Sequence, residues 1–537
     1  MTKQHTRIFV GVVLLGFFLM ASTAMAQTEI RVETPVEATA VVQVEVQAET
    51  PAAGPIDLGS KRELFMDDFL VGSMTNTEIL VHQPVREEVA IQSVEPWEGN
   101  ACGYFVMLYD EQAKIYRSYC HAWNHHPFGR LLISTYESKD GIHWTRPNVG
   151  TCEYNGSKEN NIVLDRMGDG DSCHDFAPFI DRNPAAKPEA RYKATGAAIH
   201  TTRGVWAYQS PDGLHWTPMH DGPVFTEGAF DTQNVSFWSE KEQKYVLYYR
   251  VFIDGVRAIS RAVSDDFIHW TNEGPLQFPE GEGPVELVQY YVNQVQPYYR
   301  APHLYIGFPV RYVDHGMTPS NKLLPEWEER EMRFKEDPRL GTALTDSIYM
   351  TSRDGMHFRI SNDVFLQPGL RTRHNWSYGD NYLAYRVLET DSVRDDMPRE
   401  LSLYATESHS TGKSSRLRRY TLRIDGFGSI HAKTKEGEMR TKPLVFTGSE
   451  LSINAATSAA GGIRVEILDE AGQPIPGYTL EDCDLIYGDS LDRVVTWKEN
   501  KDVSALADKP VVLRFVMKEA DLYSLIFRTE AEAKAEK

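Results

Sequence analysis

Acidic and amide residues gather at five places in this 537-residue chain, each beside a run of residues typical of a buried strand. Carboxylates that converge can hydrolyse a glycosidic bond, because one protonates the leaving oxygen while another activates water or attacks the sugar. Three aspartates are therefore candidate catalytic residues: Asp68, Asp175 and Asp231. Adjacent strand residues face opposite ways, so either Asp67 or Asp68 can be the inward residue of its pair.

Further polar and aromatic residues near these positions are candidates for holding a sugar substrate. Amide, imidazole and guanidinium groups can hydrogen-bond sugar hydroxyls, and an indole ring offers a flat apolar face. The candidates are His174, Gln233, Asn234, Arg300, His303, Trp376 and Asp380. The identity of the general acid stays open among Glu227, Glu389, Glu407 and Asp231.

A seven-residue pattern, Ser-x-Asp-Gly-x-His-Trp, occurs four times with small changes. The copies begin at Ser138, Ser210, Ser264 and Ser352, at intervals of roughly 50–90 residues. Each copy follows a β-rich run. The Asp-Gly pair, present in three of the four copies, is typical of a tight turn, since glycine accepts positive φ and aspartate bonds backbone N–H groups. We interpret the four histidines as parts of structural turns at matching places in a repeated unit, and not as a metal site.

The repeat spacing fits units of about four strands, and a fifth unit has the same rhythm without the motif. We therefore predict an all-β chain: a five-bladed β-propeller over 57–425, in which the candidate residues converge on a central funnel. A charged segment, 321–337, is predicted to be a helical insertion in the fourth unit. Alternating apolar and polar residues predict a β-sandwich over 426–530, and 531–537 a disordered tail.

The N-terminus has the pattern of an export signal. Basic residues precede an apolar run over 8–20, and small residues allow cleavage after Ala26. Residues 1–26 are therefore predicted to be a signal peptide, followed by an acidic low-complexity linker over 27–56. We expect a periplasmic or secreted protein without a membrane span, since the apolar run is too short to cross a bilayer.

The net charge of the chain limits the partners that it can bind, and its cysteine content limits the disulfides that it can form. The formal net charge of −20 would repel a polyanion, so no nucleic-acid partner is expected. Five cysteines make no disulfide framework, although Cys102 and Cys120 could pair across neighbouring strands. No cofactor is expected, apart from a structural cation that the propeller axis could hold. The oligomeric state stays open.

The repeated turns, the segment from Glu63 to Asp68 and the terminal β-rich region resemble the five-bladed propeller glycoside hydrolases. The two-domain layout is similar to glycoside hydrolase family 32, and the blade acids are similar to those of family 43. The resemblance implies Asp68 or Asp67 as nucleophile or base, and Asp175 as the acid that orients the sugar or tunes a pKa. The family 32 motifs Trp-Met-Asn-Asp-Pro-Asn-Gly, Arg-Asp-Pro and Glu-Cys are absent.

Together these observations predict an exported glycoside hydrolase acting on a plant or algal glycan or oligosaccharide. The alternatives are a non-catalytic glycan-binding propeller, and a phosphorylase or lyase on the same scaffold. A basic pocket around Arg300, with Arg257 or Arg311, would favour the phosphorylase. For the hydrolase we expect the three aspartates within roughly 5–10 Å of one another, at least one of them with a pKa raised by like charges. An Asp175→Asn variant would then be inactive but no less stable.

Overall fold

The computed structural model describes five stretches of the chain: 54–123, 130–165, 173–199, 202–410 and 414–535. Nearly all of their regular structure is β, which confirms the predicted all-β class. The predicted signal peptide and the linker up to residue 53 lie outside the described residues. Within the described stretches, no helix has the length and apolar character needed to span a membrane.

Five antiparallel sheets follow one another along the chain. The first comprises β6 (Gly103–Asp110), β7 (Ile115–Ala122), β8 (Leu132–Ser138) and β9 (Ile162–Asp165). The second comprises β10 (His174–Ile180), β11 (Tyr192–Ala198), β12 (Gly204–Ser210) and β13 (Thr217–Pro218). The third comprises β14 (Val235–Ser239), β15 (Lys244–Ile253), β16 (Val256–Ser264) and β17 (Trp270–Pro275).

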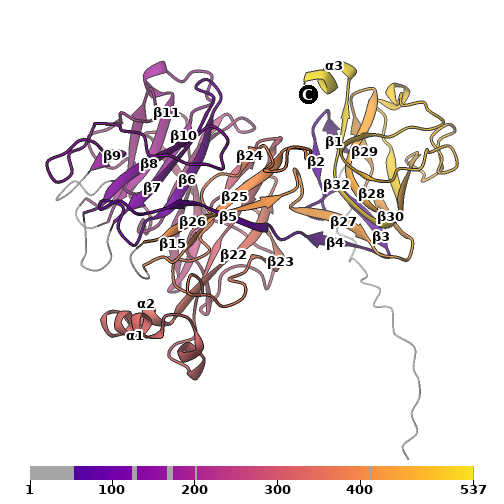
Figure 1. Cartoon of the computed structure of the whole chain (residues 1–537). Helices are drawn as coiled ribbons and strands as arrows, with labels where there is room; N and C mark the ends of the chain where they lie inside the picture. The colour runs from indigo at the N-terminus through magenta and orange to yellow at the C-terminus, as the bar shows by residue number, and fades with distance from the viewer. Residues whose placement is uncertain (1–53, 124–129, 166–172, 200–201, 411–413, 536–537) are drawn as a thin grey trace, which may run out of the picture. The chain divides into compact units, whose positions relative to one another are not determined.

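The fourth sheet has six strands: β18 (Val288–Tyr290), β19 (Gln296–Tyr298), β20 (Ala301–Gly307), β21 (Val310–Asp314), β22 (Ala343–Ser352) and β23 (Arg359–Leu366). The fifth comprises β24 (Leu388–Thr390), β25 (Glu400–Glu407), β26 (Arg416–Leu422) and β5 (Val85–Gln92). Strand β5 comes from the N-terminal side of the chain and pairs with β26; Figure 1 shows it in indigo beside the orange strands. The number of blades stays a prediction, since the fourth sheet departs from four strands.

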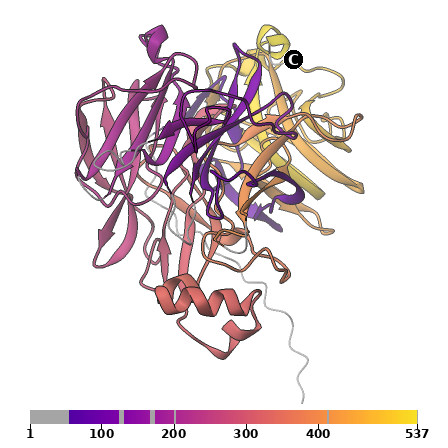
Figure 2. The same ribbon diagram turned by 60° about the vertical axis from the view of Figure 1, so that its left-hand side comes forward.

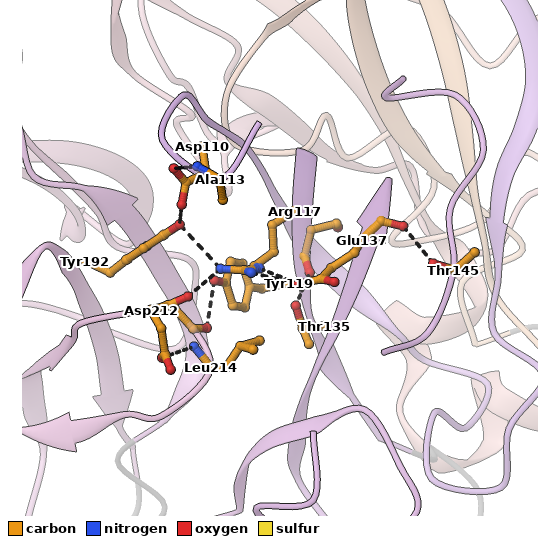
Figure 3. Close-up of polar contacts among 12 residues, drawn as sticks. Asp110, Ala113, Arg117, Tyr119, Thr135, Glu137, Thr145, Tyr192, Asp212 and Leu214 are labelled. Atoms are coloured by element: carbon orange, nitrogen blue, oxygen red, sulfur yellow. Dashed lines mark hydrogen bonds and ion pairs between the residues drawn. The ribbon is translucent and has the colours of Figure 1, made fainter. Parts of the chain in front are cut away.

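Neighbouring sheets are joined through the repeated turns, and this contact also links the last sheet to the first. The hydroxyl of Tyr119 on β7 donates to the carbonyl of Gly213 at 2.8 Å, and Tyr404 on β25 donates to that of Gly141 at 2.5 Å. Arg117 adds a bond from its Nη1 to the carbonyl of Asp212 at 2.5 Å (Figure 3). A Cβ at Gly213 would lie 2.6 Å from the Tyr119 hydroxyl, so only glycine leaves room for this contact.

Within each turn the aspartate organises the backbone. Oδ1 of Asp212 accepts the N–H groups of Leu214 and His215, both at 2.9 Å, and Oδ2 bonds Nδ1 of His215 at 2.7 Å. The other three copies make the same contacts. In the described residues none of the four histidines belongs to a group that could hold a metal ion. The contacts of the aspartates confirm that each copy of the motif forms a hydrogen-bonded turn.

The remaining strands form a separate eight-stranded sheet with its own core. It comprises β2 (Glu63–Leu64), β3 (Val71–Thr75), β4 (Thr77–Val81), β27 (Gly428–Ala432), β28 (Gly437–Thr441), β30 (Glu450–Leu468), β31 (Asp489–Val494) and β32 (Val512–Arg528). Two further strands, β1 (Ile56–Gly59) and β29 (Leu444–Phe446), pair in parallel as a two-stranded sheet of their own. Whether these strands close as a β-sandwich with the boundaries given above stays a prediction.

The N-terminal strands correct the expected start of the propeller. β2 pairs with β32, β3 with β28 and β4 with β27, so residues 63–81 are strands of the C-terminal sheet and not of a first blade. The physical reason is burial: Phe65 and Leu70 pack in the same core as Ile430 and Phe515. A hydrophobic run predicts a buried strand but not which sheet the strand joins.

In the described stretches, α-helices interrupt the β structure at one place and follow it at its end. α1 (Trp327–Glu336) and α2 (Pro338–Thr342) lie between β21 and β22, drawn in salmon in Figure 2, and match the predicted helical insertion. The expected disordered tail is corrected by α3 (Glu530–Ala535). This helix begins with a capping box, in which Glu532 accepts the Thr529 N–H at 2.7 Å and donates its own N–H to the Thr529 hydroxyl at 3.3 Å.

We expect Asp212→Ala to lower the free energy of unfolding by about 1–2 kcal/mol, because it removes two backbone hydrogen bonds and one imidazole contact. The measurement is urea unfolding followed by tryptophan fluorescence. Asp265→Ala is the matched control, since that carboxylate is 83% exposed and its ion pair is a surface one with Lys244. Equal effects of the two substitutions would contradict the role given to Asp212.

Candidate active site

Side-chain amides connect the beginnings of the strands that come first in their sheets. The connection is a series of hydrogen bonds. Nε2 of Gln233 donates to the carbonyl of Tyr104 at 2.8 Å. Nε2 of Gln294 donates to Oε1 of Gln233 and to the carbonyl of Leu383, both at 2.8 Å. These residues come from the first, third, fourth and fifth sheets in sequence, so the polar strand starts lie together at one end of the sheets.

The backbone is strained at the same place. Tyr104, Asp175 and Gln294 have φ values of 50°, 52° and 50°, in the left-handed region that non-glycine residues rarely adopt. The strand register is irregular beside two of them, between Gly103 and Val106 and between His174 and Ala177. Such strain persists only where surrounding contacts enforce it, and it clusters at functional sites.

A chain of charged side chains is built on these strained starts. Oδ1 of Asp175 bonds Nδ1 of His121 at 2.8 Å, and its Oδ2 lies 3.0 Å from Nε2 of His174. The same His174 nitrogen bonds Oδ1 of Asp231 at 3.2 Å, and Nη2 of Arg250 lies 3.6 Å from the other Asp231 oxygen. Asp175 is fully buried, whereas the Asp231 side chain is 51% exposed.

Different elements supply the members of this chain. His121 lies on β7, His174 and Asp175 open β10, and Arg250 lies on β15. Asp231 lies in the loop before β14. Only the meeting of three sheets therefore assembles the group, and Asp231 is the carboxylate in it that solvent and a ligand can reach.

The charges of this group are fixed by their mutual contacts. Burial alone would lower the pKa of His174, but the charge of Asp175 and hydrogen bonds to both aspartates outweigh it and raise the pKa to about 10. Burial would raise the pKa of Asp175, yet His174 and His121 hold it below its ordinary value. Burial likewise opposes ionisation of Asp231, and the bond from His174 with the charge of Arg250 lowers its pKa. At neutral pH an imidazolium therefore stands between two carboxylates.

This arrangement corrects the expected effect of like charges. Neither Asp175 nor Asp231 has a raised pKa, because His174 stands between them as a counter-ion. The raised value belongs to Asp380, whose pKa burial lifts to about 8. Oδ1 of Asp380 accepts the His409 N–H at 2.9 Å and Oδ2 the Ser377 N–H at 3.0 Å, so this buried carboxyl fixes two loops.

His121, His174 and Asp175 are also the residues of the described part that could hold a metal ion, with ligand atoms within 4.8 Å of one another. A cation there would have to displace the His174 proton, because a metal binds only the neutral imidazole.

The structure does not place Asp67 or Asp68 with this group. Asp68 follows β2 and pairs with Arg359 at 3.4 Å, and Asp67 bonds Arg353. Both aspartates belong to the segment that joins the C-terminal sheet. This corrects their assignment to a first-blade strand start, and with it the expected convergence of Asp68 with Asp175 and Asp231.

Arg300 and His303 also lie away from the strand starts. They follow β19, whereas Gln294 precedes it, so the two groups belong to opposite ends of that strand. Nε of Arg300 lies 3.1 Å from Asp425, and Nε2 of His303 bonds Glu63 at 2.7 Å. Sequence adjacency to a strand start was misleading here because β19 is only three residues long.

Other candidates have structural contacts of their own. Nδ2 of Asn234 donates to the carbonyl of Thr232 at 2.8 Å, and Nε1 of Trp376 donates to that of Gly369 at 2.9 Å. Cys102 and Cys120 are both free thiols and form no disulfide.

Three of the four candidates for the general acid form ion pairs or hydrogen bonds with residues outside the charged group. Glu407 is 5% exposed and pairs with Arg418 at 2.6 Å, Glu389 pairs with Arg399 at 2.8 Å, and Glu227 accepts from Asn272 at 2.8 Å. Only Asp231 lies in the charged group.

Sequence reasoning missed His121 and Arg250. Arg250 is the one charged residue inside the apolar run from Tyr245 to Ile253, and it is buried. A charge in such a run is costly unless it has a partner, so this was the available signal. His121 gave no comparable signal, since it lies near the end of a strand of mixed composition.

Comparison with solved structures finds distant likeness to carbohydrate-active enzymes. A fructofuranosidase from Schwanniomyces occidentalis is 12% identical with a TM-score of 0.37, covering 84% of this chain and 99% of that one. A Bombyx mori β-fructofuranosidase of glycoside hydrolase family 32, the family that the sequence resembles, is 10% identical with a TM-score of 0.37, covering 84% and 94%.

A structure from glycoside hydrolase family 130, which contains mannoside phosphorylases and hydrolases, is 12% identical with a TM-score of 0.37, covering 64% of this chain and 94% of that one. No protein-family model and no curated protein matches the sequence. These values assign no residue role to this chain.

The contacts of Asp175 correct the expectation that Asp175→Asn would be no less stable. We now expect this variant to lower the free energy of unfolding by about 3 kcal/mol, because it leaves the buried charge of His174 with only half of its compensation. Asp231→Asn, at the exposed end of the same group, should cost about 1 kcal/mol or less. Denaturant unfolding of both variants measures the difference. An Asp175→Asn protein as stable as the wild type would mean that His174 is neutral.

The pKa of His174 also predicts how stability depends on pH. Because the folded value of about 10 lies above the ordinary 6.5, this group's contribution is complete below pH 6.5 and is lost as the pH rises toward 10. Unfolding free energies measured from pH 6 to 10 should therefore fall more steeply for the wild type than for His174→Gln. Parallel curves would count against a shifted histidine.

Proposed function

We propose that this protein is a glycosidase that cleaves a carbohydrate substrate and that Asp231 is its reacting carboxylate. The observation that carries the proposal is an accessible carboxylate, 51% exposed, held ionised beside a protonated His174 where the strand starts meet. A carboxylate that stays charged can attack the anomeric carbon or take a proton from water, and a protonated neighbour can supply the leaving oxygen with a proton.

The two groups are coupled in a way that suits this chemistry. When Asp231 bonds to the sugar or takes up a proton, it loses its negative charge. One of the two carboxylates that hold the His174 proton is then neutral, so the pKa of His174 falls and its Nε2 proton is released more easily. Asp175 keeps its charge throughout, because it is buried and bonded to both histidines. Its part is to orient His174.

The alternative of a non-catalytic glycan-binding protein has one observation in its favour. Of the three predicted catalytic aspartates, only Asp231 is present at the site with solvent access, and the acid must be His174 instead of a second carboxyl. The phosphorylase alternative loses its expected basic pocket: Arg300 is near Asp425, and Arg311 pairs with Asp346 at 2.6 Å. Arg250, beside Asp231, and Arg257 lie over the same two rings of Phe252 and Tyr291 and remain as cations for a phosphate.

Export to the periplasm or the medium, and a plant or algal glycan as substrate, remain parts of this proposal. The export pattern of residues 1–26 supports the first. Mass spectrometry of the mature N-terminus after expression in a secreting host would test it, with Gln27 expected as the first residue.

Turnover of a panel of aryl glycosides and plant and algal oligosaccharides tests the activity. Asp231→Asn should reduce turnover at least about 100-fold while substrate binding persists, because only the reacting carboxylate is lost. Asp68→Asn is the matched control, since that carboxylate is similarly exposed at 47% but pairs with Arg359 away from the site.

Three results would change the assignment. Full activity of Asp231→Asn would contradict it outright. Binding of glycans by the wild type without turnover would identify the non-catalytic alternative, and turnover that requires inorganic phosphate would identify a phosphorylase.

A further inference from the structure

A large cavity lies where β6, β10 and β14, the first strands of the first three sheets, come to their ends. Asp231 lies at the other end of these strands, where they begin. The volume of the cavity is about 980 Å³, at the upper end of the range for small-molecule sites. It is lined by the ends of these strands: Ile180 is the last residue of β10, and Tyr109 and Trp238 are the last but one of β6 and β14. Because β10 starts at His174 and spans seven residues, the cavity lies roughly 20 Å from the charged group.

Unused hydrogen-bond donors line this cavity. Gln296 is 3% exposed, and its Oε1 accepts the Val387 N–H at 3.1 Å, which fixes the orientation of the amide. Among the described residues its Nε2 has no partner, and neither does the buried Nε1 of Trp238. A buried donor without a partner is costly unless a water or a ligand accepts its proton.

The guanidinium of Arg386 is a further hydrogen-bond donor in the wall of this cavity. Arg386 lines the cavity and stacks on the rings of Tyr385, at 4.6 Å, and Phe237, at 5.7 Å. Within the described stretches no carboxylate forms an ion pair with it, whereas Arg182 and Arg399 on the same wall pair with Glu111 and Glu389. Its φ of 81° is strained for a residue with a side chain. An uncompensated cation in a strained position favours an anionic partner.

Aromatic rings give the rest of the wall its character. Tyr109 and Tyr299 line the cavity and are each 41% exposed, although tyrosine rings ordinarily bury most of their surface. Exposed ring faces next to hydrogen-bond donors suit a ligand that has apolar C–H faces and hydroxyl oxygens, which is the surface of a sugar ring.

We propose that this cavity is a second ligand site, which binds an anionic sugar through Arg386, Gln296 and Trp238. The carboxylate or sulfate of the ligand would meet Arg386, its hydroxyl oxygens would accept from Gln296 and Trp238, and its ring would lie on Tyr109 or Tyr299. The site does not depend on the proposed hydrolytic activity, because it shares no residue with the Asp231 group.

Calorimetric titration of the full chain with glucuronate, glucose and inorganic sulfate tests the proposal. Glucuronate should bind most tightly, since only it has both the charge and the ring. Arg386→Gln should weaken its binding at least tenfold by removing the charge. Gln296→Glu should do the same, because it keeps the acceptor for Val387 and replaces the free donor by a carboxylate.

Two controls locate the effect. Arg493→Gln makes the same chemical change at an exposed position on β31 and should bind glucuronate like the wild type. Asp231→Asn should also bind it unchanged, so a failure of the hydrolytic proposal would leave this result standing. Melting curves show whether each variant is folded. If Arg386→Gln does not fold, the binding of glucuronate by Gln296→Glu tests the proposal by itself.

The proposal is overturned if the wild type binds no glucuronate, or if Arg386→Gln and Gln296→Glu bind it as the wild type does. Sulfate binding as tight as glucuronate would overturn the assignment to a sugar. Glucose binding as tight as glucuronate would overturn the assignment to an anion.

Discussion

The protonated imidazole of His174, held between the carboxylates of Asp175 and Asp231, is the interaction on which the candidate site depends. It keeps both aspartates ionised despite burial, and it supplies the proton that the proposed reaction needs. The two carboxylates differ in access, since one is fully buried and the other half exposed. That asymmetry separates a positioning residue from a reacting one, although both bond the same ring nitrogen.

This interaction requires that sheets from different parts of the chain meet accurately. The repeated turns provide that contact, because a tyrosine of one sheet donates to the turn glycine of the next, as Tyr119 does to Gly213. The third copy of the motif has Phe267 in place of glycine, and there the contact is made by the Phe267 ring, which packs against Tyr245 and Phe179. The turns that carry the repeated histidines thus provide contacts between sheets, through their glycine carbonyls.

Sequence alone could predict what is local and periodic. The turns follow from their own residues, and alternation identified the strands, so the all-β class and the role of the repeated histidines were both predictable. His174, Asp175 and Asp231 were found because polar residues beside buried strands are conspicuous. Their partners were not found: His121 comes from another sheet and is distant in sequence, and Arg250 was overlooked although it belongs to the sheet that directly follows Asp231.

The errors have the same origin. Asp68 follows a hydrophobic strand as a blade acid should, but pairing between β2 and β32 is a contact between residues more than 400 positions apart, which no local pattern specifies. The sign of the pKa shifts was wrong for a related reason. Three aspartates were considered without the histidine that lies between two of them, and a counter-ion reverses the effect of like charges.

NMR spectroscopy of the imidazole nitrogens of His174, assigned by comparison with His174→Gln, is the most direct test of this charge arrangement. We predict that both ring nitrogens remain protonated at pH 8, where an ordinary histidine is neutral. A neutral His174 ring at pH 7 would contradict the arrangement, because no positive charge would then stand between the carboxylates of Asp175 and Asp231.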